Sequence, residues 1–196
     1  MKVLHLDSGL FEGQSVTRQL SKTLVEKLGA RDVIYRDLVQ TAPAHLTADI
    51  ILAAGKAEAE RSAFEQEQVA LTETLLAELF SADVLVISAP MYNFTIPSQL
   101  KAWVDRVLQA GKTFRYTETG AEGLVTGKQV YIVSSRGGIY SEGPAAAMEH
   151  QESYLKAALA FIGLTDVQVI RAEGVNLGEE PKAKAIDAAK SAIAAL

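Results

Sequence analysis

The chain has 196 residues, no cysteine, and a net charge of −5 from 19 basic and 24 acidic residues. This length suits one domain spanning residues 1–196, and the absence of a basic block argues against a nucleic-acid partner. No apolar run approaches the ~20 residues of a membrane span, and without cysteine there is no disulfide or cysteine-bound zinc.

Five short apolar runs alternate with helix-length segments, which predicts right-handed βαβ units and a parallel sheet. The predicted strands are Lys2–Leu6, Asp32–Arg36, Asp83–Ala89, Gln129–Ser134 and Val167–Arg171. The third and fourth contain the continuous apolar runs Val84–Ile87 and Val130–Val133, as expected of central strands, whereas the second and fifth carry polar residues that suit sheet edges. We therefore predict an α/β three-layer sandwich in the flavodoxin-like strand order 2-1-3-4-5, with helices on both faces. Because Asp7 follows the first apolar run so early, we expect no signal peptide and a cytoplasmic location.

The segments between these strands carry apolar stripes at helical spacing. Trp103 lies on one stripe and is expected in the core or at a dimer interface. An extra segment over residues 40–61 contains the apolar run Ile50–Leu52, so we expect it to pack on the body or on a second subunit. The Ala-rich segment Glu179–Leu196 is predicted to be the closing helix.

The turn after the first strand has the composition of a phosphate-binding loop. Gly9 and Gly13 allow tight turns, and Ser15 and Thr17 stand where a helix opens. Free N–H groups at a helix start attract phosphate, and hydroxyls add donors without charge. The Walker lysine and the G-x-G-x-x-G spacing are both absent, so a monophosphate such as that of FMN fits best. The alternative is that Ser15 serves only as the helix N-cap.

Two further loops follow the third and fourth predicted strands, at the edge where open α/β sheets bind planar cofactors. Met91–Phe94 offers aromatic faces, and Ser135–Gly138 offers paired glycines that allow close backbone approach to a ring. N–H donors and helix dipoles at the pyrimidine edge of a flavin would favour two-electron chemistry. Ordinary core packing remains the alternative for the aromatic residues.

The segments APMYNF, TFRYTE-x-G-x-EGLVTGK and SRGGI, in this order and spacing, closely resemble the FMN-dependent NADH-azoreductases, also described as quinone reductases. The resemblance covers the whole chain. It implies a flavodoxin-like homodimer that binds one FMN per subunit near the subunit interface. In reactions of this family, as the resemblance implies, NADH or NADPH reduces the flavin at N5, and a quinone or an aromatic azo compound then takes two electrons in ping-pong order.

The resemblance also implies which residues form the site. The cofactor-binding residues are then Ser8, Gly9, Ser15, Val16, Thr17, Met91, Tyr92, Asn93, Phe94, Ser135, Arg136, Gly137 and Gly138. The family commonly has a serine where this chain has Gly9 and a polar residue where it has Val16, so Ser8 is a candidate to supply the missing hydroxyl. Phe94, Tyr116 and Phe161 are implied to bind the substrate, with Tyr116 reaching across from the partner subunit.

No side chain is expected to be catalytic, because the flavin carries the chemistry. Arg136 is a candidate clamp for a phosphate or carboxylate, although its main chain is the alternative contact. His5, His45 and His150 share no metal-ligand spacing, so no metal site is expected. Two other functions stay open: a flavodoxin-type electron carrier without its own substrate turnover, and an FMN-binding regulator. An electron carrier usually has a strongly acidic docking face, and a net charge of −5 over 196 residues is mild by comparison.

Overall fold

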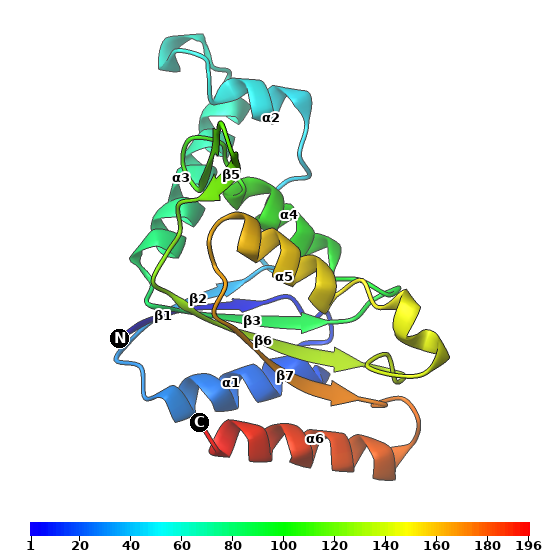
Figure 1. The fold of residues 1–196 in the computed structure, drawn as a ribbon. Helices are drawn as coiled ribbons and strands as arrows, with labels where there is room; N and C mark the ends of the chain where they lie inside the picture. The colour runs from blue at the N-terminus through cyan, green and yellow to red at the C-terminus, as the bar shows by residue number, and fades with distance from the viewer.

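Five parallel strands form the central sheet of the computed structural model, which describes residues 1–196 (Figure 1). These strands are β1 (Lys2–Asp7), β2 (Asp32–Asp37), β3 (Val84–Pro90), β6 (Gln129–Arg136) and β7 (Val167–Glu173). They lie in the order β2-β1-β3-β6-β7, which confirms the predicted 2-1-3-4-5 winding of the main sheet. The pairing register places Val3 beside Val33 on one side and beside Val84 on the other.

Burial along the strands follows the sequence texture. All seven residues of β3 are buried, and so are seven of the eight residues of β6, because helices cover both faces of the central strands. At the edges, β2 has no buried residue and β7 alternates between buried and accessible positions. Polar residues in the second and fifth strands therefore marked the edges correctly.

Helices cover the two faces of the sheet unequally. In Figure 1, α1 and α6 lie on one face, and α3, α4 and α5 lie on the other. The six helices are α1 (Val16–Leu28), α2 (Ala48–Ala53), α3 (Ala63–Ser81), α4 (Ser98–Val107), α5 (Glu152–Phe161) and α6 (Glu179–Ala194), and short 3-10 turns lie at Glu12–Gln14, Glu58–Glu60 and Pro144–Met148. The larger core cluster lies on the three-helix side and contains Trp103, which is fully buried there. No helix has both the length and the apolar character needed to cross a membrane.

The segment over residues 40–61 packs on the body of its own subunit. Its helix α2 contacts α3 and buries Ile50, whereas Ile51 and Leu52 remain largely exposed. The segment ends where Ser62 begins α3 with a capping box: Ser62 Oγ accepts from the Glu65 backbone N–H, and the Glu65 carboxylate accepts from that of Ser62. The segment therefore packs on the body, which is one of the two positions expected for it.

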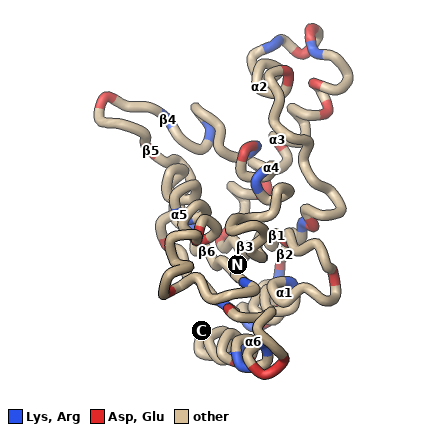
Figure 2. The backbone as a smooth tube through the Cα atoms, turned by 90° about the vertical axis from the view of Figure 1, so that its right-hand side faces the viewer, with Lys and Arg blue, Asp and Glu red and all other residues tan.

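An antiparallel hairpin, β4 (Phe114–Thr117) and β5 (Gly120–Gly123), lies between α4 and β6 and was not predicted. It projects from the body next to the three-helix face (Figure 2). Its base packs closely, because a Cβ added to Gly123 would lie 2.2 Å from the Gly163 backbone nitrogen. Only glycine therefore fits at Gly123, and this contact joins the hairpin to the end of α5.

The parallel strands bring their carboxyl ends to one edge of the sheet. After β1 the chain turns toward β2 on one side, whereas β3 lies on the other side, so a crevice opens between the loops that follow them. The loops after β6 and β7 end at the same edge (Figure 1). This edge positions the candidate site.

Candidate functional site

Ser8 and Gly9 pack the turn after β1 against the protein body. The Ser8 hydroxyl is fully buried and donates to the Ser88 carbonyl at 2.6 Å. Its only proton is used in this bond, so Ser8 offers a ligand its backbone and no hydroxyl donor. A Cβ on Gly9 would lie 2.3 Å from the Ser15 hydroxyl oxygen. Glycine at position 9 therefore lets the turn lie against the start of α1.

Ser15 is the N-cap of α1, as the N-cap interpretation of the sequence predicted. Its hydroxyl oxygen accepts from the Arg18 backbone N–H at 3.4 Å and lies 3.1 Å from the Thr17 hydroxyl. Capping does not exclude a second role, because the hydroxyl of Ser15 and the free N–H groups of the first turn all lie at the helix end. These groups favour an anion through direct donors and through the helix dipole.

Arg18 fixes this turn through its guanidinium group. Its Nε donates to the Gly9 carbonyl at 2.8 Å, and its two terminal nitrogens donate to the Asp37 carboxylate at 2.7 and 2.8 Å. The hydrogen bonds from Arg18 lower the pKa of Asp37 below its ordinary value. Arg18 thus joins the end of β2 to the turn after β1, and its charge is balanced by a carboxylate.

A polar cluster lies beneath the same turn, in which Asp7, His5 and Ser21 are buried and Tyr35 is 53% exposed. Tyr35 donates its hydroxyl proton to Asp7 at 2.9 Å, and burial raises the pKa of Tyr35 to about 12. Nearby, His5 Nε2 lies 2.9 Å from the Ser21 hydroxyl, and burial lowers the pKa of His5. His5 is therefore a neutral core histidine at neutral pH, whereas His45 and His150 are exposed. No group of three acidic or histidine side chains is placed to hold a metal ion.

The loop after β3 is a tight turn that holds two residues in left-handed backbone conformations. Tyr92 and Thr95 exchange backbone hydrogen bonds at 2.9 and 3.2 Å, and between them Asn93 has a φ of 48° and Phe94 a φ of 73°. Asparagine tolerates this region, but a bulky residue such as Phe94 is strained there. The Phe94 carbonyl accepts from the His150 backbone N–H at 2.9 Å, which attaches the turn to the start of α5. Strain held by such contacts is typical of functional loops.

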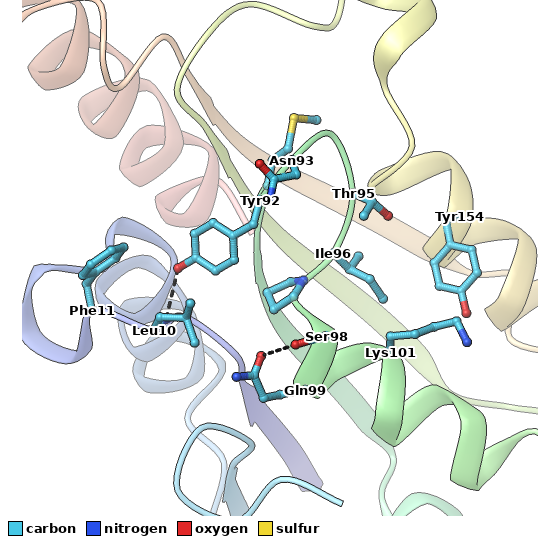
Figure 3. A pocket seen from close by; sticks show the side chains of 12 residues that line it. Leu10, Phe11, Tyr92, Asn93, Thr95, Ile96, Ser98, Gln99, Lys101 and Tyr154 are labelled. Carbon is cyan, nitrogen blue, oxygen red and sulfur yellow. Dashed lines mark hydrogen bonds between the residues drawn. The ribbon is translucent and has the colours of Figure 1, made fainter. Parts of the chain in front are cut away.

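Tyr92 connects this turn to the first loop. The Leu10 backbone N–H donates to the Tyr92 hydroxyl at 3.0 Å (Figure 3). The Tyr92 ring thereby forms a wall between two hollows, because it lines both of them. The hollow that Tyr92 shares with Gly137 has a volume of about 340 Å³. The hollow that it shares with Tyr154 has a volume of about 780 Å³.

The smaller hollow brings together residues from four loops. It is lined by Phe11, Gln14, Ser15, Val16, Pro90, Met91, Tyr92, Ser135, Gly137, Val175, Asn176 and Lys182. Six of the predicted site residues therefore share one cavity. The larger hollow adds Asn93, and Figure 3 shows Tyr154 and Lys101 on the side opposite Tyr92.

The loop after β6 presents main chain to this cavity, whereas the side chain of Arg136 is enclosed in the protein. Arg136 Nε donates to Gln151 at 2.9 Å, and its terminal nitrogens lie 2.7 Å from Glu152, 2.9 Å from Glu173 and 3.3 Å from Glu149. The candidate role of a phosphate or carboxylate clamp is wrong, because this guanidinium is only 1% exposed and its charge is already balanced. Burial alone would raise the pKa of Glu173, but hydrogen bonds from Ser141, from the Tyr140 backbone and from Arg136 outweigh it and lower the pKa.

Sequence reasoning did not predict the loop after β7. A Cβ on Gly137 would lie 2.6 Å from the Asn176 side-chain nitrogen, so the two loops touch and a larger residue at position 137 would displace the Asn176 side chain. Val175, Asn176 and Lys182 then complete the lining. The sequence offered one signal that these residues belong to the site: they follow the fifth predicted strand, and the carboxyl ends of parallel strands all lie at one edge of the sheet.

The predicted substrate residues Tyr116 and Phe161 lie together on the hairpin and at the end of α5. Phe114 packs between them, with ring centroids 5.6 Å from Tyr116 and 4.6 Å from Phe161. Tyr116 is 74% exposed and Phe161 is 38% exposed. Neither of them lines the two hollows at Tyr92, and Phe94 does not line them either. Phe94 lies in the turn after β3, with its ring centroid 6.2 Å from that of Tyr140.

Comparisons with known proteins agree with this arrangement. A family described by its flavodoxin-like fold matches residues 1–196. The chain is 57% identical to FMN-dependent NADH:quinone oxidoreductase 1 of Idiomarina loihiensis, over 98% of each chain. It is 50% identical to an FMN-dependent NADH:quinone oxidoreductase of Azospirillum brasilense, over 100% of this chain and 97% of that one.

Solved structures give the same result. An azoreductase from Bacillus anthracis superposes with a TM-score of 0.90 at 30% identity, covering 99% of this chain and 97% of that chain. An FMN-dependent NADH-azoreductase from the same species, solved in complex with FMN, superposes with a TM-score of 0.87 at 27% identity, covering 98% and 97% of the two chains.

Replacing Arg18 with methionine tests the support of the first turn. We expect Arg18→Met to lower the free energy of unfolding at pH 7 by about 2 kcal/mol, a value reduced for partial exposure. Because Arg18 lowers the pKa of Asp37, this stabilisation is present above the ordinary Asp37 pKa of 3.8 and is lost as pH falls through the lower folded value. Urea unfolding followed by circular dichroism at pH 7 and at about pH 3 measures both effects.

Lys22→Met is the matched control for Arg18→Met, since Lys22 is an exposed cation on the same helix. A difference between wild type and Arg18→Met that is equally large at both pH values would contradict the ion-pair explanation.

Proposed function

Since the chain belongs to the family with the flavodoxin-like fold that matches its whole length, we propose that it is an FMN-dependent NADH oxidoreductase. We propose quinones and aromatic azo compounds as its substrates, because its relatives are named quinone oxidoreductases and azoreductases. The observation that carries the proposal is the cavity in which the loops after β1, β3, β6 and β7 meet beside Tyr92.

The residues of this cavity fit a flavin mononucleotide. Gly9 lets the turn after β1 lie against Ser15, and Gly137 lets the loop after β6 lie against Asn176, so the loops that surround the cavity pack closely together. Ser15 and the first N–H groups of α1 are suited to a phosphate group, whereas the Thr17 side chain is fully buried and lies against the Ser15 hydroxyl. Met91–Phe94 and Ser135–Gly138 are suited to a planar ring, with aromatic cover on one side and backbone N–H donors on the other.

When bound, FMN would supply two-electron redox chemistry at N5 between NADH and the second substrate, which we propose to react in ping-pong order. The protein binds the phosphate at the start of α1 and orients the ring between the turn at Tyr92 and the loop at Gly137. Tyr92 fixes the distance between the first two loops through its bond with Leu10. The larger hollow beyond Tyr92 offers space for the nicotinamide or the acceptor in turn. No side chain is required as a proton donor, since water can supply protons.

We also propose a homodimer in which the partner completes the substrate site. Tyr116 and Phe161 lie away from the cavity of their own subunit and are exposed. A two-fold dimer would place them over the cavity of the other subunit, beside Phe94. Ile51 and Leu52, which are 59% and 62% exposed, offer further apolar surface for such an interface.

The function has a direct test. The purified protein is expected to be yellow, to release FMN on denaturation, and to oxidise NADH rapidly only when menadione or an azo dye is present. Parallel assays with NADPH measure donor preference. A colourless protein that does not bind FMN added at saturating concentration would refute the proposal, and a yellow protein without turnover would instead indicate an electron carrier.

Asn93→Gly tests the ring end of the site. Glycine keeps the φ of 48° without strain while removing the side-chain amide, so the backbone of the turn is retained. We expect the dissociation constant of FMN to rise about tenfold through loss of polar contacts near the ring. Quenching of flavin fluorescence measures the binding. His150→Ala is the control, because its exposed side chain makes no hydrogen bond and only its backbone supports the turn. Equal FMN affinity in the two variants would mean that the ring lies elsewhere.

Sedimentation velocity tests the homodimer. At micromolar concentration we expect one species with twice the chain mass of 21.0 kDa. Replacing Tyr116 with alanine should raise the KM for menadione severalfold while leaving FMN affinity unchanged, because the ring of Tyr116 is assigned to the substrate side only. A single 21.0 kDa species would exclude a shared site.

A further inference from the structure

The cavity assigned to FMN contains a single charged side chain. Among its twelve lining residues, only Lys182 carries a charge at neutral pH. The phosphate of FMN carries close to two negative charges, whereas the hydroxyl and amide groups that line the cavity are neutral. A lone lysine in an uncharged cavity of this kind has a strong electrostatic effect on an anionic ligand, because no neighbouring charge in the lining opposes it.

Lys182 comes from a part of the chain far from the phosphate-binding turn but close to it in space. It lies in the first turns of α6, and Val16, the first residue of α1, lines the same cavity. Helices α1 and α6 contact each other on one face of the sheet, and both begin at the edge where the strands end (Figure 1). The side chain of Lys182 is half-buried and forms no salt bridge, although Glu179 and Glu180 precede it on the same helix.

Other cations near this edge are already paired. Arg18 is bound to Asp37 and to the Gly9 carbonyl, and Arg136 is surrounded by three carboxylates. Lys101 lines the larger hollow and pairs with Asp105 at 2.5 Å. Lys182 is therefore the cation whose charge is available to a ligand in the smaller cavity.

We propose that the ammonium group of Lys182 binds the phosphate of FMN and supplies the positive charge that the phosphate-binding turn lacks. The inference rests on the proposed function, since it assumes that this cavity holds FMN. Ser15 and the N–H groups at the start of α1 then hold the phosphate from one helix, and Lys182 holds it from the neighbouring helix. A monophosphate is thereby distinguished from an uncharged flavin such as riboflavin.

Comparing FMN with riboflavin tests this role, because the two ligands share the ring and differ in the phosphate. In titrations of FMN-free protein followed by flavin fluorescence, Lys182→Met should raise the dissociation constant of FMN about tenfold and leave that of riboflavin unchanged. Lys182→Arg should restore most of the FMN affinity. Added NaCl should weaken FMN binding more in the wild type than in Lys182→Met, since salt screens the lost interaction.

Lys184→Met is the matched control, because Lys184 lies in the same part of α6 but lines a different hollow with Ile139 and Leu177. It changes the net charge equally and should leave both affinities unchanged. Equal weakening of FMN and riboflavin by Lys182→Met would place the lysine at the ring, and unchanged FMN binding would remove it from the site; either result overturns the inference. Wild-type protein that binds neither ligand would instead refute the proposed function.

Discussion

The ion pair between Arg18 and Asp37 is the contact on which the candidate site depends. Through it, one guanidinium holds the end of β2, the start of α1 and the Gly9 carbonyl in a single arrangement. Without that arrangement the N–H groups at the start of α1 would not converge with the turn after β1. The bidentate geometry matters as much as the charge, since a planar fork restricts orientation in a way that a lysine does not. The surface that we propose to bind phosphate is thus supported by a residue whose own charge is paired with a carboxylate.

A second arginine at this edge of the sheet, Arg136, is likewise paired with carboxylates and not exposed to the cavity. Arg136 is buried with Glu149, Glu152 and Glu173, and the pKa values of Glu149 and Glu173 are lowered despite burial, because hydrogen bonds and Arg136 stabilise their charged forms. A buried cation with several carboxylates is costly to disrupt, so this group fixes the loop after β6. Its consequence for the site is that Gly137 and its neighbours present backbone groups to an almost uncharged cavity.

The fold and much of the site could be predicted because their signals are local. Continuous apolar runs identify central strands, and polar positions identify strands at the sheet edges. Ser15 is of a residue type preferred at the N-cap of a helix. The hairpin at Phe114–Gly123 was missed because its strands are four residues long and largely exposed, so neither shows a burial pattern. The role of Arg136 was also misjudged, since the sequence does not reveal that three distant glutamates surround its side chain.

The sequence by itself determined the order of the strands and therefore the edge of the sheet where a cofactor can bind. Helix-length connections make the strands parallel, so their carboxyl ends lie at one edge of the sheet whatever the side chains in the loops. Only the tertiary structure decided which side chains reach the cavity. Asn176 and Lys182 line it, whereas Arg18 and Arg136 are paired with carboxylates. The sequence does not reveal these pairs, because the partners lie on different elements and meet only when the helices pack on the sheet.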